Sequence, residues 1–290
     1  MKPKLHWSQI SMLCRCGQQF YYRYIKGIIR PPAVALIVGS ATHVSIEKNL
    51  KHKMETKGTL LTDEAVQQAA ADDVNRRWQE EGVDLSSEDE EDVGKGEKFI
   101  RGEAVDMAVS LASLHHHELA PVIEPIHLER KWDVEISGFP CDLQGTIDIQ
   151  EHASMASVEE AEKPVSGPAG TRIRDTKTSK RSPPADKAEK DEQLTMYSLA
   201  SKVLDGDAWA RELTMDFLVK TKVPKAVVQR TVREQADFEP LLARIAAASK
   251  CIETGVFMPC SPDNWCCDPR YCGFFAMCPF VRHKTPKGKA

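Results

Sequence analysis

Two short segments rich in β-branched residues constrain this chain most, because each places a carboxylate where a strand would display it. Residues 145–148 read Gly-Thr-Ile-Asp and end at Asp148, and residues 171–178 contain Asp175 and Lys177. Such composition favours strands. Residues two apart on a strand share a face, so Asp175 and Lys177 point the same way, and pairing of the two strands would bring Asp148 beside them.

Two carboxylates and one ammonium in a single concave spot provide the groups needed for metal-assisted hydrolysis of a phosphodiester. Carboxylate oxygens are the ligands that a hard cation such as Mg²⁺ prefers. An amine beside the cation would hold and polarise an attacking water. The alternative is a solvated strand face with a surface ion pair, which is the commoner meaning of an isolated Asp-x-Lys. The other motifs of the chain decide between the two.

Length and composition fit an ordinary globular protein of one large or two modest domains, with 290 residues, 41% hydrophobic and 28% charged. No apolar run approaches the roughly 20 residues that cross a membrane, and the N-terminus has no signal-peptide pattern. We therefore expect a cytoplasmic protein with no membrane partner.

Charge is distributed unevenly along the chain. The net charge of −4 argues against a general nucleic-acid coat protein. Residues 1–46 nevertheless contain several lysines and arginines and no acidic residue, the last nine residues are basic, and 88–92 form an acidic run. Basic ends would attract phosphate locally, although a basic tail also serves solubility.

Hydrophobic periodicity and turn residues predict helices first, and then strands that alternate with helices. The predicted helices cover 6–27, a segment starting after Gly39, 62–82, 98–119, 185–204 and 234–253. The predicted strands cover 128–137, 142–150, 171–178, 213–219 and 226–233. Residues 83–96 indicate a solvated acidic loop, and 153–170 a flexible insertion at a hairpin tip.

This order of elements favours an α/β fold with a mixed β-sheet flanked by helices and a helical subdomain ahead of it. We expect a mainly helical part over 1–125, a core over 126–255, and a Cys-rich segment with a basic tail over 256–290. The adjacent histidines 115–117 splay around a predicted helix. We interpret them as a solvated helix end that cannot converge on one metal.

Nine cysteines are many for an intracellular chain, and five of them crowd residues 260–278. In a reducing compartment such clustering indicates ligation of a metal or an iron–sulfur cluster rather than disulfides. Cys14 and Cys16 lie near the other end of the chain, and Cys141 and Cys251 stand alone.

Several motifs in the right order resemble those of the PD-(D/E)xK nuclease superfamily. The matching pieces are 8–11 with 16–24, 39–43, 145–148 with 175–178, and 193–197. The chain is most similar to the RecB-like branch with an iron–sulfur cluster, which includes CRISPR-adaptation nucleases, AddB-type helicase–nuclease subunits and phage exonucleases. It departs from the pattern at Gly17, where a proline is usual, at Asp175, where many members have Glu, and in lacking a terminal Cys-x-x-Cys.

The resemblance implies a restriction-endonuclease-like core and a metal held by Asp148, Asp175, His43 and the carbonyl of Thr176. Mg²⁺ or Mn²⁺ would serve, and a histidine nitrogen suits Mn²⁺ better. Lys177 would position and activate the water. The alternative for His43 is a packed core histidine.

Gln193 and Tyr197 also belong to the implied catalytic set. They are four residues apart, so they share one helix face and would bind the scissile phosphate or order Lys177. Tyr197 packed in the core is the alternative. Glu129 resembles an acidic position of some relatives, and a solvated role fits it equally well.

For the cluster, the resemblance implies Cys16, Cys267, Cys272 and Cys278 as ligands of a [4Fe–4S] group that ties the two chain ends together. A Cys₄ zinc site satisfies the same count. Cys260 and Cys266 are substitutes among the terminal thiols, and Cys14 would replace Cys16.

The basic residues Arg23, Lys26 and Arg30 would contact phosphates of single-stranded DNA, whereas most of the neighbouring aromatic residues are expected in the core.

The expected function is a metal-dependent DNA exonuclease, a deoxyribonuclease acting on single strands or DNA ends. The setting would be recombination, phage replication or CRISPR adaptation, with proteins of those processes as partners, in a bacterium or phage. The alternatives are a non-catalytic DNA-end-binding module and a zinc-stabilised subunit of a larger DNA-processing complex.

Overall fold

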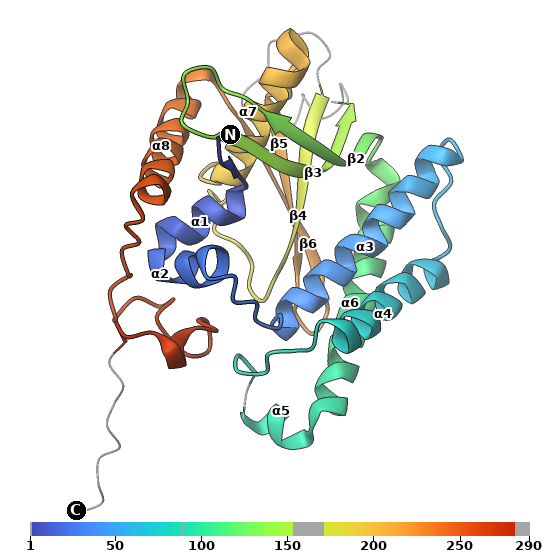
Figure 1. The fold of residues 1–290 in the computed structure, drawn as a ribbon. Coiled ribbons are helices and arrows are strands. Elements are labelled where there is room, and N and C mark those ends of the chain that lie inside the picture. The colour runs from blue at the N-terminus through green and yellow to red at the C-terminus, as the bar shows by residue number, and fades with distance from the viewer. Residues whose placement is uncertain (1, 89, 153–170, 282–290) are drawn as a thin grey trace, which may run out of the picture.

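A central sheet carries helices on both faces in this computed structural model, which describes residues 2–88, 90–152 and 171–281 (Figure 1). The predicted mixed α/β fold is confirmed. The insertion expected at 153–170 and the last nine, basic residues lie outside the described residues. Among the helices described, none has the length and apolar character needed to cross a bilayer.

The sheet consists of six described strands, of which all but the first were predicted. They are β1 (Lys4–Leu5), β2 (Pro125–Val134), β3 (Asp142–His152), β4 (Thr171–Ser179), β5 (Glu212–Val219) and β6 (Lys225–Val232). The order is β1-β3-β4-β5-β6, with β2 also paired to β3. The pairs β1–β3 and β4–β5 are parallel, and the other pairs are antiparallel. A strand of two residues gives no periodicity, which is why β1 escapes prediction.

Strand β3 has an interrupted edge. Leu143 pairs with β2 on one side and with β1 on the other, and Ile149 pairs with β2 on one side and with β4 on the other. Strands β1 and β4 therefore share one edge of β3. Between them, over residues 144–148, no described strand pairs with that edge. The sheet opens where Asp148 lies.

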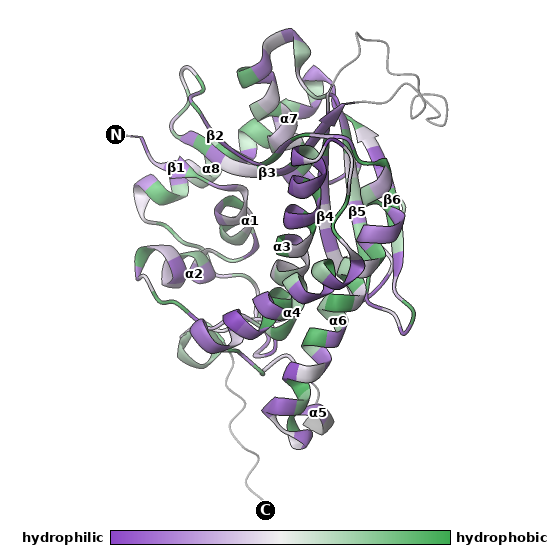
Figure 2. Ribbon diagram, turned by 90° about the vertical axis from the view of Figure 1, so that its right-hand side faces the viewer, coloured by the Kyte–Doolittle hydropathy of each residue, from purple (hydrophilic) through white to green (hydrophobic). Residues whose placement is uncertain are grey.

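Helices pack on the two faces of the sheet as separate layers. The described helices are α1 (Trp7–Arg15), α2 (Gly17–Phe20), the π-helical turn η1 (Tyr21–Ile25), α3 (Val34–Glu55), α4 (Asp63–Glu80), α5 (Glu90–Lys95), α6 (Glu97–Glu118), α7 (Glu192–Asp205) and α8 (Phe238–Thr254). One hydrophobic cluster joins α1, α7 and α8 to the sheet, and a second joins α3, α4 and α6. Figure 2 shows hydrophobic and hydrophilic residues alternating along α4 and α6, as expected for helices with one buried face.

The first predicted helix, over 6–27, is broken at Cys16, which is extended with φ −160° and ψ 110°. A tertiary contact overrides the helical pattern there. Gly17 N–H donates to the Met258 carbonyl at 2.8 Å, and a Cβ on Gly17 would lie 2.6 Å from Met258 N. Only glycine permits this approach, which joins the N-terminal segment to the Cys-rich end.

Three other boundaries differ from prediction. Helix α3 begins at Val34, with Ala33 as its N-cap after Pro31-Pro32, rather than after Gly39. The acidic segment 83–96 contains the short helix α5. Helix α7 begins at Glu192 rather than at 185, because the carboxylate of Asp191 accepts from two backbone N–H groups and caps the helix there.

Candidate active site

The opening in the sheet is bridged by the side chain of Asp148. Thr176 N–H on β4 lies 3.4 Å from Asp148 Oδ2, and His43 Nδ1 on α3 lies 3.5 Å from the same oxygen. The carboxylate thus stands where the strand partner of β3 is missing. It connects three elements that are distant in sequence.

His43 reaches Asp148 because α3 lies close to β4. A Cβ at Gly39 would come within 3.2 Å of Thr178 Oγ1, so the glycine allows the close contact of helix and strand. His43 follows about one helical turn later. The side chain of His43 is 30% exposed and faces the carboxylate of Asp148. These features fit a ligand better than a packed core histidine.

Gly145 has a separate packing role behind Asp148. It pairs with Trp132 across β2 and β3, and a Cβ there would lie 2.6 Å from Trp132 Cζ2. The indole covers the glycine and meets the Tyr197 ring edge-to-face, with ring centroids 6.5 Å apart. The glycine therefore lets the aromatic wall of the site form.

Lys177 lies at the centre of a chain of hydrogen bonds. Its Nζ is 3.0 Å and 2.9 Å from the two oxygens of Asp175 and 3.1 Å from Gln193 Oε1. The Gln193 amide in turn donates to the Tyr197 hydroxyl at 2.5 Å. The structure therefore brings together the residues predicted for the catalytic set, with Tyr197 both packed against Trp132 and bonded to Gln193.

Arg233 fixes the start of α7 and so the position of Gln193. It is 3% exposed and donates to the carbonyls of Ala188 and Asp191 at 3.0 Å each, and to Thr195 Oγ1 at 2.7 Å. A buried guanidinium with several backbone acceptors is rigid. It supports the face that carries Gln193 and Tyr197.

The site carries an excess of buried negative charge. Burial, together with the nearby carboxylates of Asp148 and Asp191, raises the pKa of Asp175 to about 7 against the opposing effect of Lys177. Burial alone would lower the pKa of Lys177, but Asp175 and Asp148 outweigh it and the pKa is raised, so the amine stays charged. A divalent cation would relieve the repulsion between the carboxylates.

The predicted metal ligands are close but are not gathered around one point. Among the described residues, the group whose ligand atoms all lie within 4.8 Å of one another is Asp63, His116 and His117, and not His43, Asp148 and Asp175. The reason is that Asp175 is turned toward Lys177. A cation at Asp148 would have to draw Asp175 away from the ammonium.

Glu129 is a functional candidate that the sequence left undecided. It lies inside β2 with φ +46°, a conformation that non-glycine residues rarely adopt and that clusters at functional sites. Burial, Asp148 and Glu47 raise the pKa of Glu129 to about 7. Glu47, four residues after His43 on α3, is close enough to affect Glu129. It was not singled out from the sequence, although that spacing places it on the same helix face as His43.

Six cysteines line one small cavity at the junction of the chain ends. They are Cys16, Cys260, Cys266, Cys267, Cys272 and Cys278. The sulfurs of Cys260 and Cys266 are 3.5 Å apart, and Cys260 N lies 3.4 Å from Cys16 Sγ. None of the cysteines is in a disulfide. Cys14 does not line this cavity; it lines a neighbouring pocket with Arg244, to which Cys16 and Cys260 also contribute.

The predicted DNA-binding residues lie on the segment between α2 and α3. Arg23 is half-buried, and Lys26 and Arg30 are exposed. Lys26 Nζ lies 5.4 Å from the centroid of the Tyr21 ring, and Phe20 is buried in the core as expected. The two exposed cations remain accessible to a ligand.

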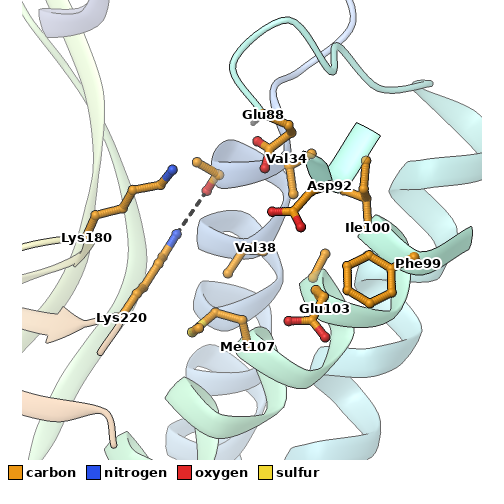
Figure 3. Close-up of a pocket in the computed structure, with 12 residues that line it drawn as sticks. Val34, Val38, Glu88, Asp92, Phe99, Ile100, Glu103, Met107, Lys180 and Lys220 are labelled. Carbon is orange, nitrogen blue, oxygen red and sulfur yellow. Dashed lines mark hydrogen bonds between the residues drawn. The ribbon is translucent and has the colours of Figure 1, made fainter. Parts of the chain in front are cut away.

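Strand β4 ends at a second concavity, beyond the catalytic residues (Figure 3). Lys180 follows the last residue of β4, Lys220 follows the last residue of β5, and both line this pocket. None of the predicted catalytic residues lines it.

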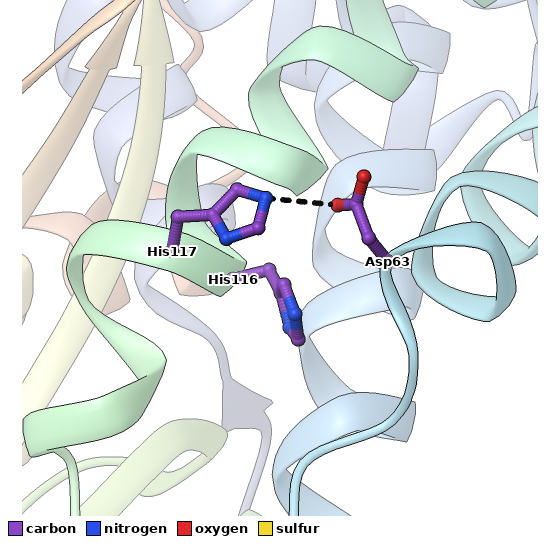
Figure 4. Close-up of side chains that lie close together, drawn as sticks. All are labelled: Asp63, His116 and His117. Carbon is purple, nitrogen blue, oxygen red and sulfur yellow. Dashed lines mark ion pairs between the residues drawn. The ribbon is translucent and has the colours of Figure 1, made fainter.

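The three adjacent histidines differ from prediction. His115 and His116 are buried, and only His117 is exposed, because the last turn of α6 packs between neighbouring elements. The expected solvated helix end was therefore wrong for His115 and His116. His116 and His117, without His115, approach Asp63 closely enough for a metal ion (Figure 4). His117 Nε2 pairs with Asp63 at 3.2 Å.

The tautomer of His116 argues against that metal site. Asn49 Oδ1 accepts from Leu61 N–H at 3.0 Å, which fixes the amide. Its NH₂ group therefore faces His116 Nδ1, 3.1 Å away. With Nδ1 accepting, the proton of the neutral ring is on Nε2. A metal there would have to displace it, so we interpret the group as an ion pair between α4 and α6.

Comparisons with known proteins identify the fold. A sequence model of the PD-(D/E)XK nuclease superfamily matches residues 5–279, and no curated protein matches significantly in sequence. The crystal structure of a "Putative exonuclease" from Eubacterium rectale is similar with a TM-score of 0.54 and 11% identity, over 92% of this chain and 87% of that chain. The structure of SSO0001 is matched with a TM-score of 0.38 and 13% identity, over 96% of this chain and 87% of that chain.

Proposed function

The chain belongs to the PD-(D/E)XK nuclease superfamily, and on that premise we propose that it is a metal-dependent deoxyribonuclease that removes nucleotides from single-stranded DNA or DNA ends. The single observation that carries the proposal is Lys177, held between Asp175 and Gln193 beside the opening at Asp148. It has the position and the charge to hold an attacking water against a bound phosphate.

The donor set around the opening fits a divalent cation. Members of the superfamily typically use Mg²⁺ or Mn²⁺. Asp148, Asp175, His43 and the carbonyl of Thr176 would hold the ion, and they offer hard oxygens and one imidazole. When bound, the cation supplies polarisation of the phosphate and stabilisation of the departing oxygen.

The protein's own residues prepare the attacking water and the phosphate. The side chain of Lys177 is 37% exposed while that of Asp175 is fully buried, so the amine can hold a water on its solvent side. The Gln193 carbonyl and, until a cation draws it away, Asp175 fix the amine between them. Tyr197 bonds the Gln193 amide, and Arg23, Lys26 and Arg30 would hold the strand by its phosphates.

We also assign the chain to the RecB-like branch, with a [4Fe–4S] cluster held by Cys16, Cys267, Cys272 and Cys278. The six-thiol cavity supports this, since thiolates are the ligands of such clusters and Tyr22, Phe274 and Val281 enclose it. A Cys₄ zinc site is the alternative with the same count of thiolates, and iron and sulfide analysis would distinguish it from the cluster. Its role would be structural, joining the chain ends.

The test is a nuclease assay with 5′- and 3′-labelled single- and double-stranded DNA in Mg²⁺ or Mn²⁺. We expect stepwise shortening of single strands or of frayed ends by the native protein, and none by Asp175→Asn. The control is Asp186→Asn, which removes an exposed carboxylate that pairs with Lys190. Equal activity of Asp175→Asn and Asp186→Asn would overturn the assignment. Internal cleavage of circular single strands would contradict exonuclease action. The biological setting we propose is recombination, phage replication or CRISPR adaptation.

A further inference from the structure

A pocket of about 400 Å³ lies between α3, α6 and the ends of β4 and β5 (Figure 3). Its volume falls in the range of small-ligand sites, roughly 300–1,000 Å³. The walls differ in character. One wall has two lysines, the opposite wall has three carboxylates, and apolar side chains lie between. The residues used below are Lys180, Lys220, Glu88, Asp92, Glu103 and Phe99.

The cationic wall follows from the sheet. Strands β4 and β5 are parallel neighbours that end in register at Ser179 and Val219, and Lys220 N–H donates to the Ser179 carbonyl at 2.7 Å. The next residues, Lys180 and Lys220, therefore leave the sheet side by side and point into the same pocket (Figure 3).

Neither lysine has an ion-pair partner among the described residues. Lys220 makes one long hydrogen bond, 3.5 Å to the Ala35 carbonyl. Burial and the neighbouring Lys180 lower the pKa of Lys220 to about 8, and Glu88 opposes this only in part. Two ammonium groups that repel each other at the end of a partly enclosed pocket have the charge for a dianion.

The opposite wall of the pocket is negatively charged and favours a ligand group that donates hydrogen bonds. Glu88, Asp92 and Glu103 present carboxylates toward the lysines (Figure 3). They would repel an anion and accept hydrogen bonds from amino groups. Val34, Val38 and Met107, with the Phe99 ring, line the space between the two walls. A ligand that fits has a dianion at one end, a flat apolar body and an amino group at the other end.

We propose that this pocket binds a nucleotide that carries a terminal phosphate monoester, with the phosphate between Lys180 and Lys220 and an amino-bearing base toward Glu103. The biological role of this pocket rests on the proposed nuclease function, whereas nucleotide binding by the pocket does not. Lys180 is three residues beyond Lys177 and directly follows the end of β4, so the two residues are about 10 Å apart. The pocket is therefore within reach of a strand whose scissile bond lies at the catalytic residues.

The carboxylate wall selects among bases. Adenine and cytosine carry an exocyclic amino group that donates to a carboxylate, whereas thymine presents a carbonyl in the corresponding position. Facing a carboxylate, that carbonyl would leave two acceptors in contact, which is unfavourable. Nucleotides of the amino-bearing bases should therefore bind more tightly than thymidine nucleotide.

The test is calorimetric titration of the full chain in EDTA with dAMP, dTMP and deoxyadenosine. We expect dAMP to bind at least about tenfold more tightly than deoxyadenosine, since charge-assisted hydrogen bonds contribute that order of affinity. Lys180→Gln/Lys220→Gln should abolish the difference. The matched control is Lys222→Gln/Lys225→Gln, which removes two exposed lysines at the start of β6 and its turn. Glu103→Gln should remove the preference for dAMP over dTMP.

The results of this titration test the pocket independently of the proposed nuclease activity. Because no metal is present, binding does not depend on cleavage, and Asp175→Asn should bind dAMP like the native chain. Competition by 5′-phosphorylated but not 5′-hydroxyl oligonucleotides would identify a strand end as the source of the phosphate, and competition by mononucleotides alone would identify a released product. Equal binding of dAMP and deoxyadenosine, or unchanged dAMP affinity in a folded Lys180→Gln/Lys220→Gln variant, would overturn the proposal.

Discussion

Lys177 Nζ lies 3.1 Å from Gln193 Oε1 across 16 residues of sequence, and this contact joins β4 to α7. The amide carbonyl accepts from the ammonium, and the amide NH₂ donates to Tyr197. Gln193 therefore orients Lys177 rather than contacting the metal ligands. Its loss should affect the rate of the chemical step more than substrate binding.

Gln193→Ala should lower kcat by about 10- to 100-fold with little change in KM, because the amine that holds the water loses one of its two fixed partners. The control is Val203→Ala, on an exposed position of the same helix. Steady-state kinetics on labelled single strands would measure both. A Gln193→Ala variant that matches Val203→Ala would show that Asp175 alone positions Lys177.

Asp148→Ala, Asp175→Ala and Lys177→Ala should each reduce cleavage by at least about a thousandfold, because the metal and the activated water are both needed for the chemical step. DNA binding in Ca²⁺ should survive, since it relies on the basic surface.

His43→Ala should lose most activity and regain part of it at raised Mn²⁺, because two carboxylates remain to hold the ion. Activity against Mn²⁺ concentration would measure the rescue, and thermal unfolding would show whether the variant folds. Unfolding of the variant with native metal affinity would instead indicate a packing role for the imidazole.

Cys16→Ser should remove the visible absorption near 400 nm that is expected of a thiolate-bound iron cluster. It should also lower Tm by about 10 °C, because the cluster links the two ends of the chain and its binding free energy contributes to the stability of the fold. Cys267→Ser, Cys272→Ser and Cys278→Ser should behave similarly. Cys14→Ser and Cys141→Ser are the matched controls, because neither thiol lines the shared cavity. Iron and sulfide would be counted for each. Full iron in Cys16→Ser with loss in Cys260→Ser or Cys266→Ser would show that the cluster is confined to the C-terminal segment.

Gly17→Ala should lower the free energy of unfolding by about 2–4 kcal/mol, since the added Cβ would overlap the Met258 backbone and strain of this kind has that order of cost. Gly102→Ala is the control. It is inside α6 with no atom near its Cβ position, so alanine should stabilise by about 0.5–1 kcal/mol. Denaturant unfolding would measure both, and a neutral Gly17→Ala would mean that the Cys-rich end can move away.

The affinity for dAMP should depend on pH through Lys220. Its pKa of about 8 lies below the ordinary lysine value, so the charge is present below pH 8 and is lost as the pH rises. The phosphate becomes a dianion above about pH 6. Binding should therefore be strongest between about pH 6 and 8. The other charged groups that face the pocket are Lys180, Glu88, Asp92 and Glu103. Lys220→Arg should keep the affinity at pH 9, because a guanidinium does not titrate there. An identical pH profile in that variant would exclude Lys220 as the titrating group.

The sequence alone determined the features that depend on local periodicity and capping. The shared face of Asp175 and Lys177 follows from their spacing on a strand, and that of Gln193 and Tyr197 from their spacing on a helix. Thr62 caps α4 as its side chain and the following acidic residues indicate. The family resemblance rested on the same short motifs, and the family is confirmed.

Tertiary structure alone decided which of these faces meet. The opening at residues 144–148 results from β1 and β4 sharing one edge of β3. The sequence pattern of a single strand does not predict which residues of a distant strand pair with it. The burial of His115, the break at Cys16 and the strained Glu129 likewise depend on packing partners far away in sequence. Lys180 and Lys220 are 40 residues apart, and only the parallel pairing of β4 with β5 brings their charges into one pocket. Local sequence sets the direction of a side chain within its element, but long-range packing sets what that side chain faces.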